Sequence, residues 1–111
     1  MIQHIVLLKF KPDTLPDDIA DLEMRMDALP EAIVEIQSYE FGRDLVGSKR
    51  SYDFGLVSLF ANLEAVQRYQ VHPEHLKLLE LIKKICESVI TVDFEYDYKP
   101  AEGPLRGTDL F

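Results

Sequence analysis

The chain has 111 residues, the length of one compact domain. Hydrophobic residues make up 47% and charged residues 29% of the chain, a balance typical of a folded globular protein and not of a disordered or membrane-embedded one. Twelve Lys and Arg against twenty Asp and Glu give a formal net charge of −8, which disfavours nucleic acid and anionic membranes as partners. The one cysteine, Cys86, has no partner for an intramolecular disulfide, and the first residues lack the features of a signal peptide, so we expect a reducing, cytoplasmic setting.

The first predicted element is a strand over residues 2–10. Side chains alternate along it, with His4, Val6 and Leu8 on one side. Ile5 and Leu7 lie on the other side, so both faces of this strand are largely apolar.

A helix is predicted over residues 15–29, where apolar side chains recur every three or four positions. Thr14 precedes it as a cap whose hydroxyl can satisfy a free backbone N–H. Pro30 predicts its end, because the ring removes a donor and disfavours helical geometry at the preceding residue.

Three further strands and an irregular tail are predicted. Residues 34–45 and 52–61 are predicted to form a hairpin across a turn near Gly47, and residues 89–98 alternate as the last strand. Residues 99–111 contain two prolines and two glycines, which predicts an irregular C-terminal tail.

Two helical segments precede the last strand. Asn62 is the expected cap of a short helix that ends at Tyr69. After a break at His72 and Pro73, a second helix is expected over residues 73–87, with Cys86 as a small buried hydrophobic residue.

The element order is βαββαβ, which predicts a ferredoxin-like α+β fold with both helical layers on one face of a four-stranded antiparallel sheet. The other face is also apolar, with Ile5, Leu7, Val57 and Leu59 on it. Leaving these side chains in water forgoes several kcal/mol of burial, at about 25 cal/mol per Å2. We therefore predict a homodimer that pairs through its sheet faces. The alternative is that these residues reflect strand propensity on a partly solvated surface.

Residues 4–11 (HIVLLKFK), 39–44 (YEFGRD) and 69–75 (YQVHPEH) resemble the Dabb family, the stress-responsive dimeric α/β-barrel domain. The resemblance covers about residues 2–98 and implies one Dabb-like domain over residues 1–98, followed by the tail. It implies a ferredoxin-like protomer whose sheets pair in a dimeric α/β barrel, in agreement with the element order.

A plant branch of this family contains a polyketide cyclase that works without a metal or an organic cofactor. Carried over by matching motif, its pocket residues fall on His4, Tyr69 and His75. That branch has a histidine early in the third strand, where this sequence has Phe54. The resemblance therefore implies the pocket without implying the substrate.

These three residues could support proton transfer. Apolar surroundings disfavour the charged form of His4, and a helix start at Pro73 disfavours it at His75, which lies in the first turn. Six residues of continuous helix would turn Tyr69 and His75 about 600° apart, so the break at Pro73 is what could bring them into one pocket. His75 could then act as a general base while Tyr69 and His4 donate hydrogen bonds to developing negative charge.

Two functions remain open from the sequence. The first is binding of a small apolar or aromatic molecule between sheet and helices, in a pocket walled by side chains such as Leu8, Leu22, Met26 and Phe54. The alternative is a cofactor-independent enzyme with polyketide cyclase-like or related proton-transfer chemistry. Phe54 favours binding, because a cyclase-like site would place a polar residue there. A cofactor-free oxygenase is suggested by shared architecture alone.

Structural roles are the competing interpretation of the same residues. His72 is the expected helix cap, Tyr69 could be a tyrosine at the edge of the core, and His4 and His75 could be buried, hydrogen-bonded histidines. The pair His72 and His75 lacks the third and fourth ligands of a zinc site, and we expect no metal and no other cofactor.

Overall fold

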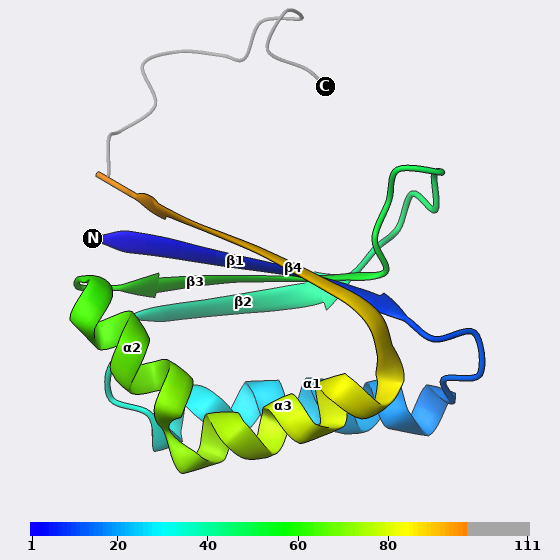
Figure 1. The fold of residues 1–111 in the computed structure, drawn as a ribbon, viewed down its shortest axis with the longest axis horizontal. Helices are drawn as coiled ribbons and strands as arrows, with labels where there is room; N and C mark the ends of the chain where they lie inside the picture. Colours follow the sequence, from blue (N-terminus) through cyan, green and yellow to red (C-terminus); the bar gives the residue numbers. More distant parts are fainter. Residues whose placement is uncertain (98–111) are drawn as a thin grey trace, which may run out of the picture.

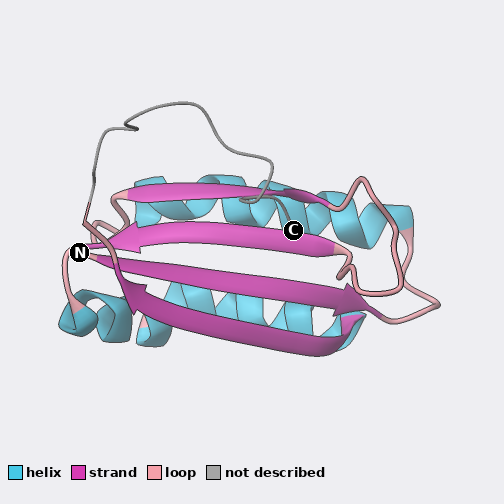
Figure 2. Cartoon of the chain, turned by 90° about the horizontal axis from the view of Figure 1, so that it is seen from above, coloured by secondary structure: helices cyan, strands magenta, loops and turns pink. Residues whose placement is uncertain are grey.

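The computed structural model describes residues 1–97, with elements in the order β1 (Ile2–Phe10), α1 (Pro16–Ala32), β2 (Ser38–Arg43), β3 (Phe54–Phe60), α2 (Leu63–Val71), α3 (Pro73–Ile85) and β4 (Cys86–Glu95). The four strands form one antiparallel sheet in the order β2-β3-β1-β4. All three helices lie on one side of it (Figure 1), and Figure 2 shows the sheet from its uncovered side with the helices behind. The predicted ferredoxin-like α+β fold is confirmed.

The core lies between the sheet and the helices. Alternate residues of β1 and β3 are buried there, as the two-residue period of a strand requires. A stripe on α1 supplies the opposite wall with Leu22, Met26 and Leu29. The largest fully buried side chains are Tyr69, Phe54, Phe60, Leu8, Leu22, Met26, Ile33 and Leu78.

The predicted cap and the predicted end of the first helix are both wrong, whereas its predicted start at residue 15 lies one residue from the observed start at Pro16. Thr14 does not cap α1, because its hydroxyl donates to the carbonyl oxygen of Ile85 at 2.8 Å and so ties the start of α1 to the end of α3. The carboxylate of Asp18 accepts from the N–H of Leu15 instead. Pro30 does not end the helix, which continues to Ala32. Pro30 lacks the N–H of a helical hydrogen bond, but only Glu31 and Ala32 of the helix follow it, so the interruption affects little of α1.

The junction between α3 and β4 also differs from the prediction. The helix ends at Ile85, and Cys86 is the first residue of β4, where it pairs with Phe10. The N–H of Lys11 donates to the carbonyl oxygen of Ile85 at 2.8 Å, which helps to fix the end of the helix there. Cys86 is buried, as expected, but in a strand and not on a helix.

The hairpin strands are shorter than predicted. β2 begins at Ser38 and not at residue 34, and β3 covers Phe54–Phe60. The predicted turn near Gly47 is confirmed, since Gly47 has a φ of 66° and its N–H donates to the Asp44 carboxylate. The predicted tail over residues 99–111 lies outside the described residues.

The uncovered face of the sheet is apolar across the two central strands and the edge strand β4. Cross-strand partners share a face, so the pairing of Ile5 with Val57 and with Val92 places all three on it. Ile90 and Phe94 extend the same surface along β4, and Val92 is 52% exposed. This surface, formed by Ile5, Leu7, Val57, Leu59, Ile90, Val92 and Phe94, is called the open face below.

Within the described part of the chain, no helix is both long and apolar enough to cross a bilayer. The cytoplasmic setting expected from the composition stays a prediction.

Candidate functional site

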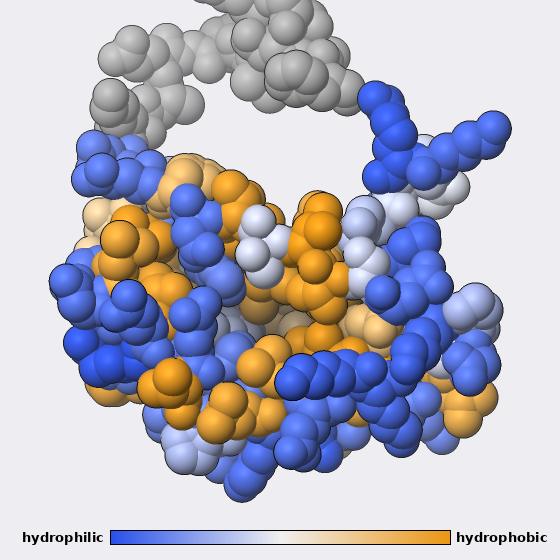
Figure 3. All heavy atoms as spheres, viewed as in Figure 1, coloured by the Kyte–Doolittle hydropathy of each residue, from blue (hydrophilic) through white to orange (hydrophobic). Residues whose placement is uncertain are grey.

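A cavity of about 370 Å3 opens between the helix-facing side of the sheet and α3. Figure 3 shows the protein hollowed between the sheet layer and the helices, with apolar side chains gathered around the recess. Most of the cavity wall is apolar, with Val6, Met26, Leu56, Leu78, Leu79 and Ile82 among its lining residues. The polar residues that line it are His4, Tyr69, Gln70, His75, Lys83 and Thr91. Mostly apolar walls with a few polar groups are typical of a small-molecule site.

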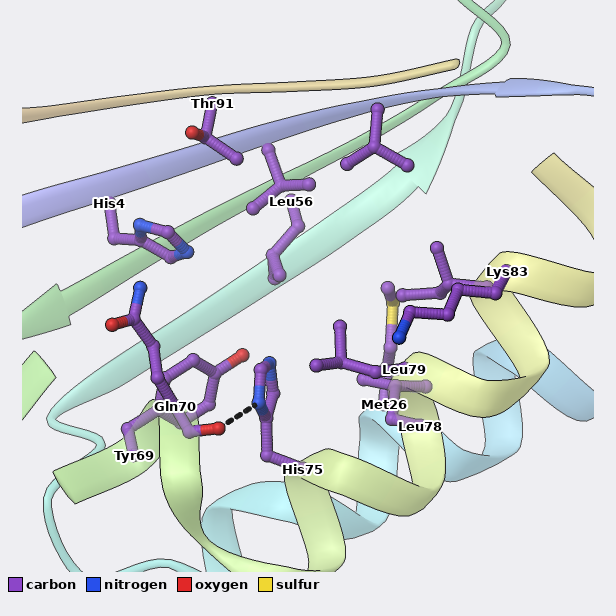
Figure 4. Close-up of a pocket in the computed structure, with 13 residues that line it drawn as sticks. His4, Met26, Leu56, Tyr69, Gln70, His75, Leu78, Leu79, Lys83 and Thr91 are labelled. Atoms are coloured by element: carbon purple, nitrogen blue, oxygen red, sulfur yellow. Dashed lines mark hydrogen bonds between the residues drawn. The ribbon is translucent and has the colours of Figure 1, made fainter. Parts of the chain in front are cut away.

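Tyr69 and His75 come together because the helix breaks between them. His72 has an extended backbone, and its ring accepts a hydrogen bond from the N–H of Glu74, which confirms it as the cap of α3. Pro73 then occupies the first turn, which its fixed φ suits. The Tyr69 and His75 rings lie with their centroids 4.2 Å apart, and both line the cavity (Figure 4).

The hydrogen bonding of His75 determines which of its ring nitrogens is free. Nδ1 lies 3.0 Å from the carbonyl oxygen of Gln70, drawn as the dashed line in Figure 4. A carbonyl can only accept, so Nδ1 carries the proton, and Nε2 of the neutral ring keeps its lone pair. Burial lowers the pKa of His75, and the nearby rings of His4 and His72 lower it further, against an opposing effect of the Gln70 carbonyl. His75 is therefore a neutral hydrogen-bond acceptor at neutral pH.

His4 extends from β1 into the cavity and is held by a carboxylate on β4. Its Nδ1 lies 2.5 Å from Oδ1 of Asp93, the residue that pairs with it across the two strands. An ionised carboxylate only accepts, so Nδ1 donates and the ring orientation is fixed. The backbone carbonyl of His4 accepts from the buried Ser58 hydroxyl at 3.1 Å, which also fixes the strand beneath it.

A second tyrosine completes this group. The Tyr39 hydroxyl from β2 lies 3.0 Å from the Tyr69 hydroxyl. Burial raises the pKa of Tyr69 to about 12 and also raises the pKa of Tyr39, so both phenols are protonated at neutral pH. When Tyr39 donates to Tyr69, the Tyr69 proton is free to be donated elsewhere.

The structure therefore brings His4, Tyr69 and His75 to one cavity, as the sequence predicts. Of the predicted walls, only Met26 lines the cavity; Leu8 and Leu22 are buried in the core outside it. The other predicted wall residue, Phe54, also lies outside the cavity, where it stacks on Phe41 at 6.0 Å between ring centroids.

Sequence reasoning missed the partners of the predicted residues, Tyr39 and Asp93, and two lining residues, Gln70 and Lys83. A register between the first and last strands would have found Asp93, since it pairs with His4. The register of the neighbouring strands would likewise have found Tyr39, since it pairs with Ser58, which in turn pairs with His4.

Among residues 1–97 no three His, Cys, Asp or Glu side chains gather in a way that could hold a metal ion. The polar side chains that line the cavity are hydrogen-bond donors and acceptors, set in a mostly apolar wall.

Comparison with known proteins gives relatives over nearly the whole chain. A stress-response A/B barrel domain-containing protein of Arabidopsis thaliana is 28% identical over 112 residues, which cover 97% of this chain but only 42% of that protein. A crystal structure of a dimeric ferredoxin-like protein of unknown function from Thermobifida fusca shares 30% identity and a TM-score of 0.79, over 86% of this chain and 90% of that one.

A hydroxynitrile lyase from Passiflora edulis has a TM-score of 0.77 at 16% identity, over 89% of this chain and 96% of that one, and shares the fold alone. The model of the Stress responsive A/B Barrel Domain, Dabb, matches residues 2–96. Since the match includes every strand and helix described above, the chain belongs to the Dabb family of stress-responsive A/B barrel domains.

Proposed function

We propose that this domain binds one small apolar or aromatic molecule in the cavity between its sheet and α3. The observation that carries the proposal is a cavity of about 370 Å3 whose wall is mostly aliphatic and whose polar groups include His4, Tyr69 and His75. A filled interior would have supported a purely structural role for the same residues. The apolar wall supplies affinity, and the polar residues orient the ligand.

The test uses 2-acetylnaphthalene as an uncharged aromatic probe, titrated into 15N-labelled protein. At about −0.4 kcal/mol per heavy atom, a Kd on the order of 0.1 mM is expected. Leu79→Trp places an indole in the cavity, so the probe should no longer change the chemical shifts of the amides around the cavity. Leu76→Trp is the matched control, because Leu76 lies on the same helix, is 48% exposed and does not line the cavity. Equal binding by both variants, or no binding by the native protein, refutes the proposal.

The domain is also proposed to form a homodimer through the open face. In support, the open face carries side chains from three strands that no helix of the described chain covers, and the Thermobifida relative is described as dimeric. Packing this surface against a second copy removes its aliphatic side chains from water, at about 25 cal/mol per Å2 of apolar area.

Light scattering tests the dimer. The native chain should give twice the mass of the 12.8 kDa protomer, whereas Val92→Asp should give one protomer, because a carboxylate would be buried unpaired at the interface. Val71→Asp is the control, since Val71 is exposed on α2 away from the sheet. Circular dichroism confirms that each variant is folded. A native chain that scatters as a single protomer refutes the dimer.

A cofactor-independent enzyme is the second candidate, and the free Nε2 of His75 is the observation that favours it. A C–H proton next to a ligand carbonyl would move to Nε2, and the electron pair would move onto the carbonyl oxygen. Tyr69, with its own oxygen accepting from Tyr39, would donate to that oxygen. His4 donates through Nδ1 to Asp93, so its Nε2 could donate only when the ring is protonated.

The two candidates are separated by exchange of the acidic α-hydrogens of 2-tetralone in deuterium oxide, followed by proton NMR. An enzyme accelerates the exchange, and His75→Gln reduces the acceleration by about 100-fold or more, the usual contribution of a general base. His72→Gln should retain it, because that ring caps α3 and does not line the cavity. Binding without acceleration leaves the domain as a binding protein.

A further inference from the structure

One cationic side chain belongs to the cavity wall. Lys83 lines the cavity together with the aliphatic residues of α3, and Figure 4 shows its side chain reaching from the helix into the site. The other lining residues are apolar or carry uncharged polar groups, apart from the two histidines. No aspartate or glutamate of the described chain lines the cavity, although acidic residues outnumber basic ones in the sequence by 20 to 12.

The position of Lys83 differs from that of the other lysines on α3. Lys77 forms an ion pair with Glu74 at 3.1 Å, and Lys84 lies on a separate surface groove that also contains Asp21 and Glu80. For Lys83, residues 1–97 supply neither an ion pair nor a side-chain hydrogen bond. Its ammonium group is therefore available to a molecule in the cavity.

The two ends of the cavity differ in charge. Lys83 follows His75 by eight positions on α3, which is about 12 Å along the helix at 1.5 Å per residue. His75 is a neutral hydrogen-bond acceptor because burial lowers its pKa, so its ring offers no positive charge to an anion at neutral pH. At the other end the ammonium group of Lys83 attracts an anion. Between them lie aliphatic walls that include Leu79 and Met26.

We infer that the cavity selects apolar molecules that carry one carboxylate, with the carboxylate against Lys83 and the apolar body pointing toward Tyr69 and His75. This inference rests on the proposed binding function and names its ligand class. The separation along α3 suits a body about the size of two fused aromatic rings. Lys83 is thereby a specificity-determining residue, and the aliphatic wall provides the rest of the affinity.

The experiment compares 2-naphthoate with 2-acetylnaphthalene, two probes of nearly equal shape that differ in charge. Calorimetric titrations of the native protein, Lys83→Gln and Lys84→Gln are made at low salt. The native protein should bind 2-naphthoate about fivefold more tightly, the effect of one partly exposed ion pair. The ratio of the two dissociation constants should fall to about one in Lys83→Gln and stay near five in Lys84→Gln. Raising the salt to about 0.5 M should reduce the native ratio.

Each outcome bears on one of the two proposals. If 2-acetylnaphthalene binds and 2-naphthoate binds no better, the carboxylate inference is overturned while the proposed binding function stands. If both lysine variants lower the ratio equally, general surface charge and not Lys83 is responsible, and the inference is likewise overturned. If neither probe binds, the proposed function itself fails and the inference fails with it.

Discussion

The hydroxyl pair of Tyr39 and Tyr69 gives a quantitative test of how the site is held together. Tyr69 is 1% exposed, and its hydroxyl lies 3.0 Å from that of Tyr39. Within residues 1–97 neither side chain has another hydrogen-bond partner. Replacing one tyrosine by phenylalanine removes the bond and leaves the second hydroxyl without its partner, whereas replacing both removes the bond and both polar groups.

The expected energies follow from that difference. A neutral hydrogen bond contributes about 1 kcal/mol net, and a buried hydroxyl left without a partner costs a further amount of about 1 kcal/mol or more. Tyr39→Phe and Tyr69→Phe should therefore each lower the free energy of unfolding by about 1 to 2 kcal/mol. The double variant should lose about 1 kcal/mol, well below the sum, so the coupling energy is about 1 kcal/mol or more.

Urea unfolding followed by circular dichroism measures all four proteins. One protein concentration is used throughout, because dimer formation would make stability depend on concentration. Additivity within about 0.3 kcal/mol would refute the reasoning, since it would mean that the two hydroxyls do not interact in solution.

Three further predictions concern single groups. Because burial raises the pKa of Tyr69 to about 12, its contribution to stability is complete below about pH 10 and is lost as the pH rises toward 12; the alkaline loss of stability in urea unfolding should be smaller by about 2 to 3 kcal/mol in Tyr69→Phe, where Tyr39 alone of the two remains. Burial lowers the pKa of His75, so its ring should titrate by NMR below about 6.5, and the stability it contributes should be lost as the pH falls through that lower pKa; titration at or above 6.5 would contradict the assignment. Asn62 accepts from the N–H of Ala65 at 2.8 Å as the cap of α2, and Asn62→Ala should cost about 1 kcal/mol in urea unfolding, while an unchanged midpoint would contradict the capping role.

The fold could be predicted because the spacing of apolar residues along the sequence indicates which face of a helix or strand is buried. Alternation along residues 2–10 placed His4, Val6 and Leu8 together, and the structure buries all three on the helix side. Element ends were less predictable. A proline interrupts helical hydrogen bonding, but the sequence pattern does not reveal that the helix continues for two residues beyond Pro30.

The site could be predicted only in part because its geometry depends on tertiary contacts. The break at Pro73 indicated that Tyr69 and His75 could meet, and they do. The partners Asp93 and Tyr39 come from strands distant in sequence, and their contacts depend on strand register and on the position of α2. The cavity itself cannot be predicted from the sequence. Aliphatic residues line the cavity wall and also fill the packed core, so the residue type does not distinguish the two positions.

The direct passage from α3 into β4 has a consequence for how the shape of the cavity is fixed. Ile85 and Cys86 are adjacent, so α3 and β4, which both contribute residues to the cavity wall, diverge from a single peptide bond (Figure 1). Two hydrogen bonds hold this junction in place. The backbone N–H of Lys11 and the hydroxyl of Thr14 both donate to the carbonyl oxygen of Ile85. The angle between α3 and β4 is thereby held by the backbone at their junction, so substitutions in the lining can change the cavity surface while that angle stays the same.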